Sequence, residues 1–208
     1  MIHPLLSVVS GLSLFTTGGL RLAGLAVPTR IPNGPNKGVI VPVAEDVTGT
    51  RAWEHGQYNE LLPNEHYKGV FFFEQASDVE YLGRGDGVTR DTLYYEADVV
   101  LKGWVNTQKV SATPYLTARL VLELTRDLTQ GQSDFSRDAG RHLVTAGQFT
   151  GAFTDVQVLR QLRHGPDVFG SYPELVPEVL PEFEYFGLLL RLRFGVGMSC
   201  FDEVIQAT

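Results

Sequence analysis

The feature that most constrains the fold is a long alternating segment near the C-terminal end of this 208-residue chain, residues 186–200. Hydrophobic side chains occupy its even positions, from Phe186 to Cys200. Its odd positions carry glycine, serine, leucine and two arginines, Arg191 and Arg193. A period of two over this length is typical of a β-strand with one buried face. The segment therefore predicts a strand that anchors a sheet and turns a polar face away from the core.

A second alternating segment, residues 92–108, predicts another long strand. Its buried face is expected to carry Leu93, Tyr95, Ala97, Val99, Leu101 and Val105. Large aromatic and arginine side chains on the opposite face of such a strand often mark a protein interface. The polar faces of the two long strands together provide the candidate interface residues, which are Trp104, Lys102, Arg191, Arg193, Tyr94 and Glu96. A layer of helices that covers this face would explain the pattern equally well, so both interpretations stay open.

Three shorter segments also predict strands. Residues 20–27 and 39–43 flank a segment rich in turn residues, and they are expected to form a β-hairpin with a long loop. Pro42 indicates an edge strand, because proline removes a hydrogen-bond donor from the ladder. Residues 70–74 are apolar at successive positions, which favours a strand with both faces covered.

Three segments predict helices. Residues 4–15 carry an apolar stripe behind Pro4, although a cleaved secretory signal is an alternative that lacks its usual positive start. Thr113 and Pro114 are typical of a helix start. Residues 154–164 carry apolar residues at helical spacing, while Val156 and Val158 also fit a short strand. We therefore expect an α+β fold, a mostly antiparallel β-sheet with two or three helices packed on one face and long loops.

The length and composition bound the organisation of the chain. A chain of 208 residues with 43% hydrophobic residues is expected to form a single domain, residues 1–208, with a core of its own. Residues 45–67 form a polar excursion that contains aromatic side chains, and residues 165–181 form a proline-rich connection. The net charge of −7 argues against a general nucleic-acid-binding protein. The single cysteine, Cys200, is expected to be a buried thiol.

The sequence contains no strong motif for catalysis or for metal binding. The five histidines have no spacing typical of a zinc site. A loop site built on His55, Glu60 and His66 is a hydrolase alternative with little support. Glu182 and Glu184 are interpreted as solvated charges at the edge of a strand. We therefore expect no enzyme activity, no metal and no cofactor.

The order of the expected elements resembles that of the tail-terminator and tail-completion proteins of tailed bacteriophages. Three parts of the chain carry the resemblance: residues 94–106, the helix expected from Pro114, and residues 186–194. The chain is longer than the usual small terminators, and the excursion at residues 45–67 has no obvious counterpart in them.

This resemblance implies a structural virion protein without catalysis, assembled in the host cytoplasm. Its subunits would form a homo-oligomeric ring, often a hexamer, that caps the tail tube and joins it to the head connector. DNA would pass through the lumen without specific binding, and no membrane would be involved. The alternative is a β-rich module that binds a carbohydrate or a peptide, in which Trp53, Trp104 and Tyr58 would supply stacking surfaces.

Overall fold

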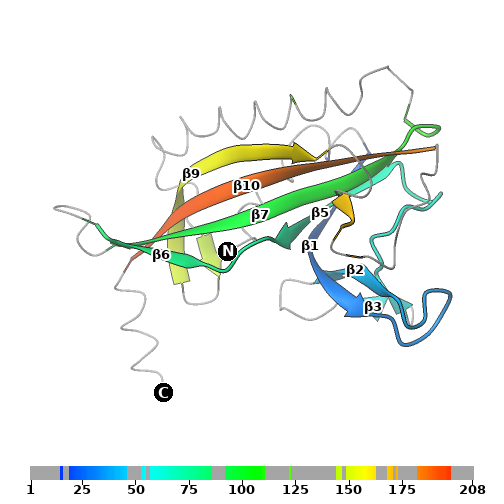
Figure 1. Cartoon of the computed structure of the whole chain (residues 1–208), viewed down its shortest axis with the longest axis horizontal. Helices are drawn as coiled ribbons and strands as arrows, with labels where there is room; N and C mark the ends of the chain where they lie inside the picture. The colour runs from blue at the N-terminus through cyan, green and yellow to red at the C-terminus, as the bar shows by residue number, and fades with distance from the viewer. Residues whose placement is uncertain are drawn as a thin grey trace.

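The computed structural model describes residues 15, 19–45, 53–54, 57–85, 92–110, 122, 144–146, 149–162, 168–170, 172 and 182–197. Side chains are described at all of these positions except 53–54, 57–58, 144–146 and 149–154. Every secondary-structure element within these residues is a β-strand (Figure 1). The expected α+β fold is therefore wrong for the described part of the chain, which is all-β with 65% of its residues in strands.

The three expected helices have different outcomes. Those at residues 4–15 and from Thr113 lie outside the described residues, apart from Phe15 and Leu122. The third expected helix is wrong, because β9 (Phe149–Leu162) is a strand through that region.

A bulge in β9 explains why this strand resembles a helix in sequence. Arg160 pairs with Leu189 and Val158 pairs with Leu190, so Leu159 is the extra residue between them. A bulge moves the residues that follow it to the opposite face. Val156 and Leu162 consequently pack on opposite faces of the sheet, while Leu159 is 41% exposed. Their spacing of three residues comes from this register shift and not from a helical turn.

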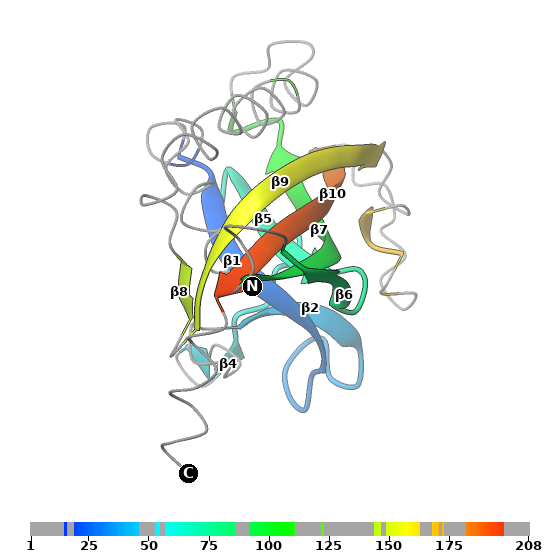
Figure 2. The same ribbon diagram turned by 90° about the vertical axis from the view of Figure 1, so that its left-hand side faces the viewer.

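Eight of the ten strands in the described part of the chain form one sheet (Figures 1 and 2). Its main path runs β2-β1-β5-β7-β10-β9-β8, and β6 pairs with β7 beside this path. The strands of the sheet are β1 (Arg21–Arg30), β2 (Ile40–Glu45), β5 (Gly69–Gln75), β6 (Glu80–Arg84), β7 (Thr92–Asn106), β8 (Val144–Ala146), β9 and β10 (Phe183–Gly197). All pairings are antiparallel except that of β1 with β5. The short strands β3 (Trp53–Glu54) and β4 (Gln57–Tyr58) pair with each other within the excursion.

The two alternating segments form the centre of the sheet. The predicted strands are confirmed as β7 and β10, which pair along their full lengths from Thr92–Gly197 to Asn106–Phe183. On the other side of β7, β5 pairs with residues 99–105 and β6 pairs with residues 93–96. The half of β7 and β10 beside β6 therefore extends beyond the region that β5 covers.

The expected hairpin and its edge position are also confirmed. Strands β1 and β2 pair antiparallel, and β2 lies at one end of the main path. The outer side of β2 is partly covered, because Leu61 N donates to Pro42 O at 2.9 Å and Ala44 N donates to Asn59 O at 3.0 Å.

Hydrophobic side chains cover both faces of the sheet around β5. The first core cluster consists of Leu20, Phe71, Phe73, Val99, Leu101, Val105, Val156, Phe186, Leu188, Leu190 and Leu192. The second core cluster consists of Ala26, Ala44, Leu61, Val70, Phe72, Trp104, Val168, Phe169, Tyr172, Phe183 and Tyr185. Because Phe71 and Phe72 are consecutive strand residues, the two clusters lie on opposite faces. This arrangement confirms that both faces of residues 70–74 are covered.

Candidate interaction site

The six candidate interface residues do not lie on one continuous exposed surface. Trp104 and Lys102 are buried inside the chain, at the end of β7 where β5 pairs with it. Glu96, Arg191, Arg193 and Tyr94 lie at the other end of the β7–β10 pair. The polar face of these strands is therefore covered at one end and accessible at the other.

Trp104 is part of the second core cluster and has no exposed surface. Its indole Nε1 donates to Leu61 O at 3.0 Å, and its ring meets Phe183 edge-on at a centroid distance of 5.4 Å. Trp104 consequently offers no stacking surface to a ligand. The layer that covers it contains residues of the proline-rich connection, such as Phe169, and not a helical element of the described chain.

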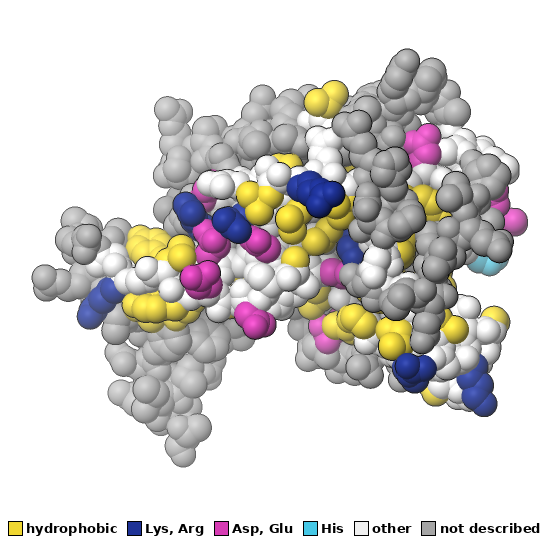
Figure 3. Space-filling model, in the orientation of Figure 1, with side chains coloured by type: hydrophobic (Ala, Val, Ile, Leu, Met, Phe, Trp, Pro, Cys, Tyr) yellow, Lys and Arg dark blue, Asp and Glu magenta, His cyan; other side chains and the backbone are white. Residues whose placement is uncertain are grey.

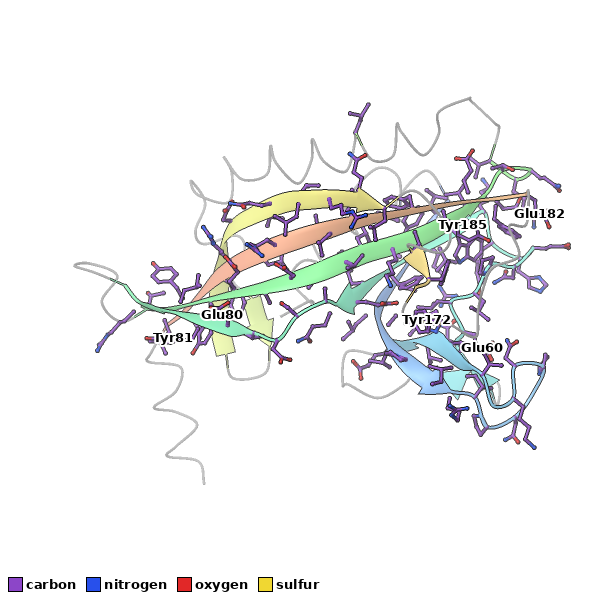
Figure 4. The ribbon with its side chains drawn as sticks, in the orientation of Figure 1. Glu60, Glu80, Tyr81, Tyr172, Glu182 and Tyr185 are labelled. Carbon is purple, nitrogen blue, oxygen red and sulfur yellow. The ribbon has the colours of Figure 1, made fainter. Side chains whose placement is uncertain are left out.

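Lys102 belongs to a buried polar group with Glu74 and Tyr172. Lys102 Nζ lies 2.7 Å from Glu74 Oε2, and Tyr172 Oη donates to Glu74 Oε1 at 2.7 Å. Burial and the nearby Glu74 carboxylate raise the pKa of Tyr172 above its usual value. The phenol therefore stays protonated and keeps donating its hydrogen bond. This contact fixes Tyr172 of the proline-rich connection over the sheet, as seen toward the centre right of Figure 4.

At the accessible end, acidic and basic side chains pair across β7 and β10. The Arg191 guanidinium donates to both carboxylate oxygens of Asp98, at 2.9 and 3.2 Å. Arg193 Nε donates to Glu96 Oε2 at 2.6 Å, and Arg191 Nε lies 3.2 Å from Glu96 Oε1. The hydrogen bond to Asp98, followed by the charges of Asp98 and Glu96, raises the pKa of Arg191. Both arginines are thus held in place by the chain itself.

Acidic side chains of the two neighbouring strands lie beside these ion pairs. Glu80 on β6 lies opposite Glu96, and Asp155 on β9 lies opposite Arg193. We call Glu80, Glu96, Asp98, Asp155, Arg191 and Arg193 the charged row. Figure 3 shows blue and magenta side chains interleaved over this half of the face. The side chains of Arg191 and Arg193 are 36% and 45% exposed, so the row can contact a partner while its internal ion pairs remain intact.

Tyr94 lies on the same face, next to two glycines. It pairs with Gly195 on β10 and with Gly83 on β6. A side chain at Gly195 would approach Tyr94 Cε1 to 3.2 Å, so the ring lies close against the Gly195 backbone. The absence of a side chain at Gly195 makes room for this ring beside the charged row.

The opposite face of the same region carries an aromatic row, Tyr81, Tyr95 and Phe194. These residues come from β6, β7 and β10 and lie in register. Tyr95 lies 5.6 Å from each neighbour, and it stacks on Phe194 at an interplanar angle of 19°. We call β6, residues 92–98 of β7, residues 191–197 of β10 and residues 151–157 of β9, which pair with β10 here, the distal arm. Figure 4 labels Glu80 and Tyr81, the first two residues of β6.

The residues considered for metal binding or ligand stacking do not form a site in the described part of the chain. No group of three or more metal-ligating side chains occurs among the residues that the structure describes. His66 N donates to Asn64, and Glu60 accepts a hydrogen bond from Asn36, while His55 lies outside the described residues. The side chains of Trp53 and Tyr58 are not among those described. Within the described ranges, no helix has the length and hydropathy needed to cross a membrane.

No family model matches this chain, and no curated protein has significant sequence similarity to it.

Sequence reasoning missed several residues of these groups. Glu74 could have been noticed because a carboxylate follows a run of three phenylalanines, where only a buried partner makes it favourable. Tyr81 and Leu82 are a signal as well, because two large apolar residues stand between the charged residues Glu80 and Arg84, in a segment without the regular alternation of a strand. Tyr172 offered no signal, since its partner Glu74 is 98 positions away.

Proposed function

We propose that this chain is a structural virion protein, a ring-forming tail-terminator or neck subunit that caps the tail tube and joins it to the head connector. The observation that carries the proposal is the pairing of the two strand segments on which the resemblance rests. Residues 94–106 and 186–194 lie side by side in β7 and β10, in uninterrupted register. Together they form the central support of the sheet and extend into the distal arm.

The distal arm has the properties of an assembly surface. The charged row on one face has side chains that are already oriented by ion pairs, so less side-chain entropy is lost when a partner binds. The aromatic row on the other face ends in Tyr81, which is 54% exposed. Ring subunits need two different surfaces that complement each other, and the two faces of one arm can provide them. The proposed partners are further copies of this chain, the tail tube and the head connector.

The test uses the full-length chain at micromolar concentration, by negative-stain imaging and by measurement of particle mass. We expect closed rings of uniform mass for the natural sequence. A strictly monomeric protein would contradict the proposal. A monomer that binds a glycan or peptide array would favour the alternative module instead.

A charge-exchanged variant examines the role of the charged row. The four substitutions Arg191→Glu, Arg193→Glu, Glu96→Arg and Asp98→Arg keep opposite charges next to each other across β7 and β10, but they exchange the charges that a neighbour meets. Position 193 then carries the same charge as Asp155, whereas position 96 carries the charge opposite to that of Glu80. We expect a thermal transition close to that of the natural protein together with loss of the rings. Rings that persist in this variant would place the contact elsewhere.

The double variant Arg191→Glu and Arg193→Glu is the matched comparison. It places two glutamates opposite Glu96 and Asp98, so it is expected to lower the thermal transition as well as to abolish assembly. The difference between the two variants separates the contribution of the charges to the fold from their contribution to assembly.

A further inference from the structure

Strand β6 has an exposed outer edge. One side of β6 pairs with β7, and no strand of the described chain pairs with its other side. The apolar side chains at and beside this strand are among the most exposed of the residues that the structure describes: Val79 at 46%, Tyr81 at 54% and Leu82 at 47%. An edge strand with exposed apolar side chains is a ready template for pairing with another strand.

The protection that such edges usually carry is limited at β6. The outer side of β2 has Pro42 and is partly covered by residues 59–61. By contrast, β6 contains no proline and no lysine, and its charged side chains, Glu80 and Arg84, stand only at the two ends of this strand of five residues. A bulge between Tyr81 and Gly83 limits the regular part of β6, and Gly83 has a φ of 137°. The regular part of this edge therefore lies at Glu80 and Tyr81.

We propose that β6 pairs antiparallel with β6 of a second copy of this chain, so that the two sheets join into one. The charges along the strand favour this occupant and this direction. The segment begins with Asp78 and Glu80 and ends with Arg84. In an antiparallel pair the acidic start of each strand lies beside the arginine of the other, whereas a parallel pair would bring like charges together.

The aromatic row supports the same arrangement. Its members follow one another from Phe194 through Tyr95 to Tyr81, and Tyr81 is the last residue before the open edge. Pairing about Tyr81 places the two Tyr81 rings close to each other on one face. The row then continues from one subunit into the next, and the exposed phenol rings become partly buried.

This contact is two-fold symmetric, because the same strand is used by both copies. Any closed assembly that uses it throughout contains an even number of chains. The inference goes beyond the proposed virion role and does not depend on it, since it rests on the edge of β6, the charges along that strand and the aromatic row.

The experiment compares Leu82→Lys with Leu159→Lys in the full-length chain by sedimentation velocity across a concentration series. Both leucines are exposed, at 47% and 41%, but Leu159 lies on β9. The natural protein and Leu159→Lys are expected to show the same even-numbered species. Leu82→Lys is expected to weaken that association at least tenfold, with an unchanged circular dichroism spectrum. An unchanged association in Leu82→Lys, or a natural protein that stays monomeric, would overturn the proposal.

A charge exchange tests the identity and direction of the partner strand. Asp78→Arg and Arg84→Asp, each alone, place like charges beside each other in an antiparallel pair, and each is expected to weaken association. The double variant restores opposite charges and is expected to associate like the natural protein. If the double variant were weaker than both single variants, the occupant would not be a second antiparallel β6. Ring formation scored on the same samples distinguishes a failure of this contact from a failure of the proposed ring.

Discussion

The buried contacts of Lys102 show how single residues in this chain acquire their roles. Lys102 and Trp104 lie on the strand face that alternation predicts to be polar, yet both are buried, at 4% and 0% exposure. Both residues are buried because the Glu74 carboxylate pairs with Lys102 and because residues of the proline-rich connection, such as Tyr172, pack over this part of the face. Alternation identifies which residues share a face, but it does not identify what packs on that face. Contacts between residues so far apart in sequence were therefore beyond the reach of the sequence pattern.

Removal of Glu74 is predicted to be more harmful than joint removal of the buried pair. Glu74→Leu removes the carboxylate from beside a buried ammonium group and from the Tyr172 hydroxyl. We expect this change to lower the free energy of unfolding by about 3–5 kcal/mol. The double variant Glu74→Leu and Lys102→Met is expected to recover part of that loss, because no buried ammonium remains. Urea denaturation measures both values, and a double variant that is less stable than the single variant would contradict this account.

The pKa of Tyr172 predicts a loss of stability in alkaline solution. This pKa is raised in the folded chain above the ordinary value of 10.0 by burial and by Glu74. The contribution of the protonated phenol is fully present below pH 10, and it declines above that pH because the unfolded chain ionises more readily. Between pH 9 and 11, the natural protein is expected to lose stability more steeply than Tyr172→Phe. Equal slopes of unfolding free energy against pH in the two proteins would argue against the proposed environment of Tyr172.

At the scale of elements, the alternating segments were predictable and the interrupted ones were not. β7 and β10 keep a period of two, because each faces a core cluster along most of its length. β9 was mistaken for a helix because its bulge at Leu159 changes the face in mid-strand. β6 was not anticipated, because most of its side chains are exposed and it has no buried stripe to reveal it. A strand that lacks a continuous buried face leaves little signal in a single sequence.

Close packing between β5, β7 and β10 is predicted to make Gly103 sensitive to substitution. Gly103 pairs with Phe71 on one side and Phe186 on the other, and these two rings lie 4.9 Å apart. A Cβ at Gly103 would lie 2.5 Å from a ring carbon of Phe71. Gly103→Ala is expected to lower the free energy of unfolding by about 1–3 kcal/mol.

Gly187→Ala is the matched control in the same strand pair. Its Cβ would first meet the Leu162 side chain at 3.1 Å, which can rotate away. We expect a smaller loss than in Gly103→Ala when both are measured by urea denaturation. A Gly103→Ala variant as stable as the natural protein would show that the β5–β7 packing differs from the one described.

At the scale of the whole molecule, β7 and β10 run through two regions of the sheet, the distal arm and the remainder, which we call the body. In the body, both faces of the sheet are covered by core clusters. In the arm, the first core cluster continues to Leu192, whereas the charged row on the opposite face and Tyr81 at the edge are accessible. The sequence predicted which residues share the polar face, including Arg191, Arg193, Tyr94 and Glu96. It did not predict where the second core cluster stops covering this face, because that depends on where β5 stops and β6 begins along β7. The division between body and arm is thus a property of strand register.

The central claim, that the distal arm is an assembly surface, is tested most directly by amide hydrogen exchange at two protein concentrations. The comparison is between β6 and β2, which both lie at edges of the same sheet. We predict that exchange of β6 amides slows as concentration rises from nanomolar to tens of micromolar, because assembly covers that edge. Exchange in β2 is predicted to stay constant. Rates in β6 that do not change with concentration, or protection that increases in β2 instead, would contradict the claim.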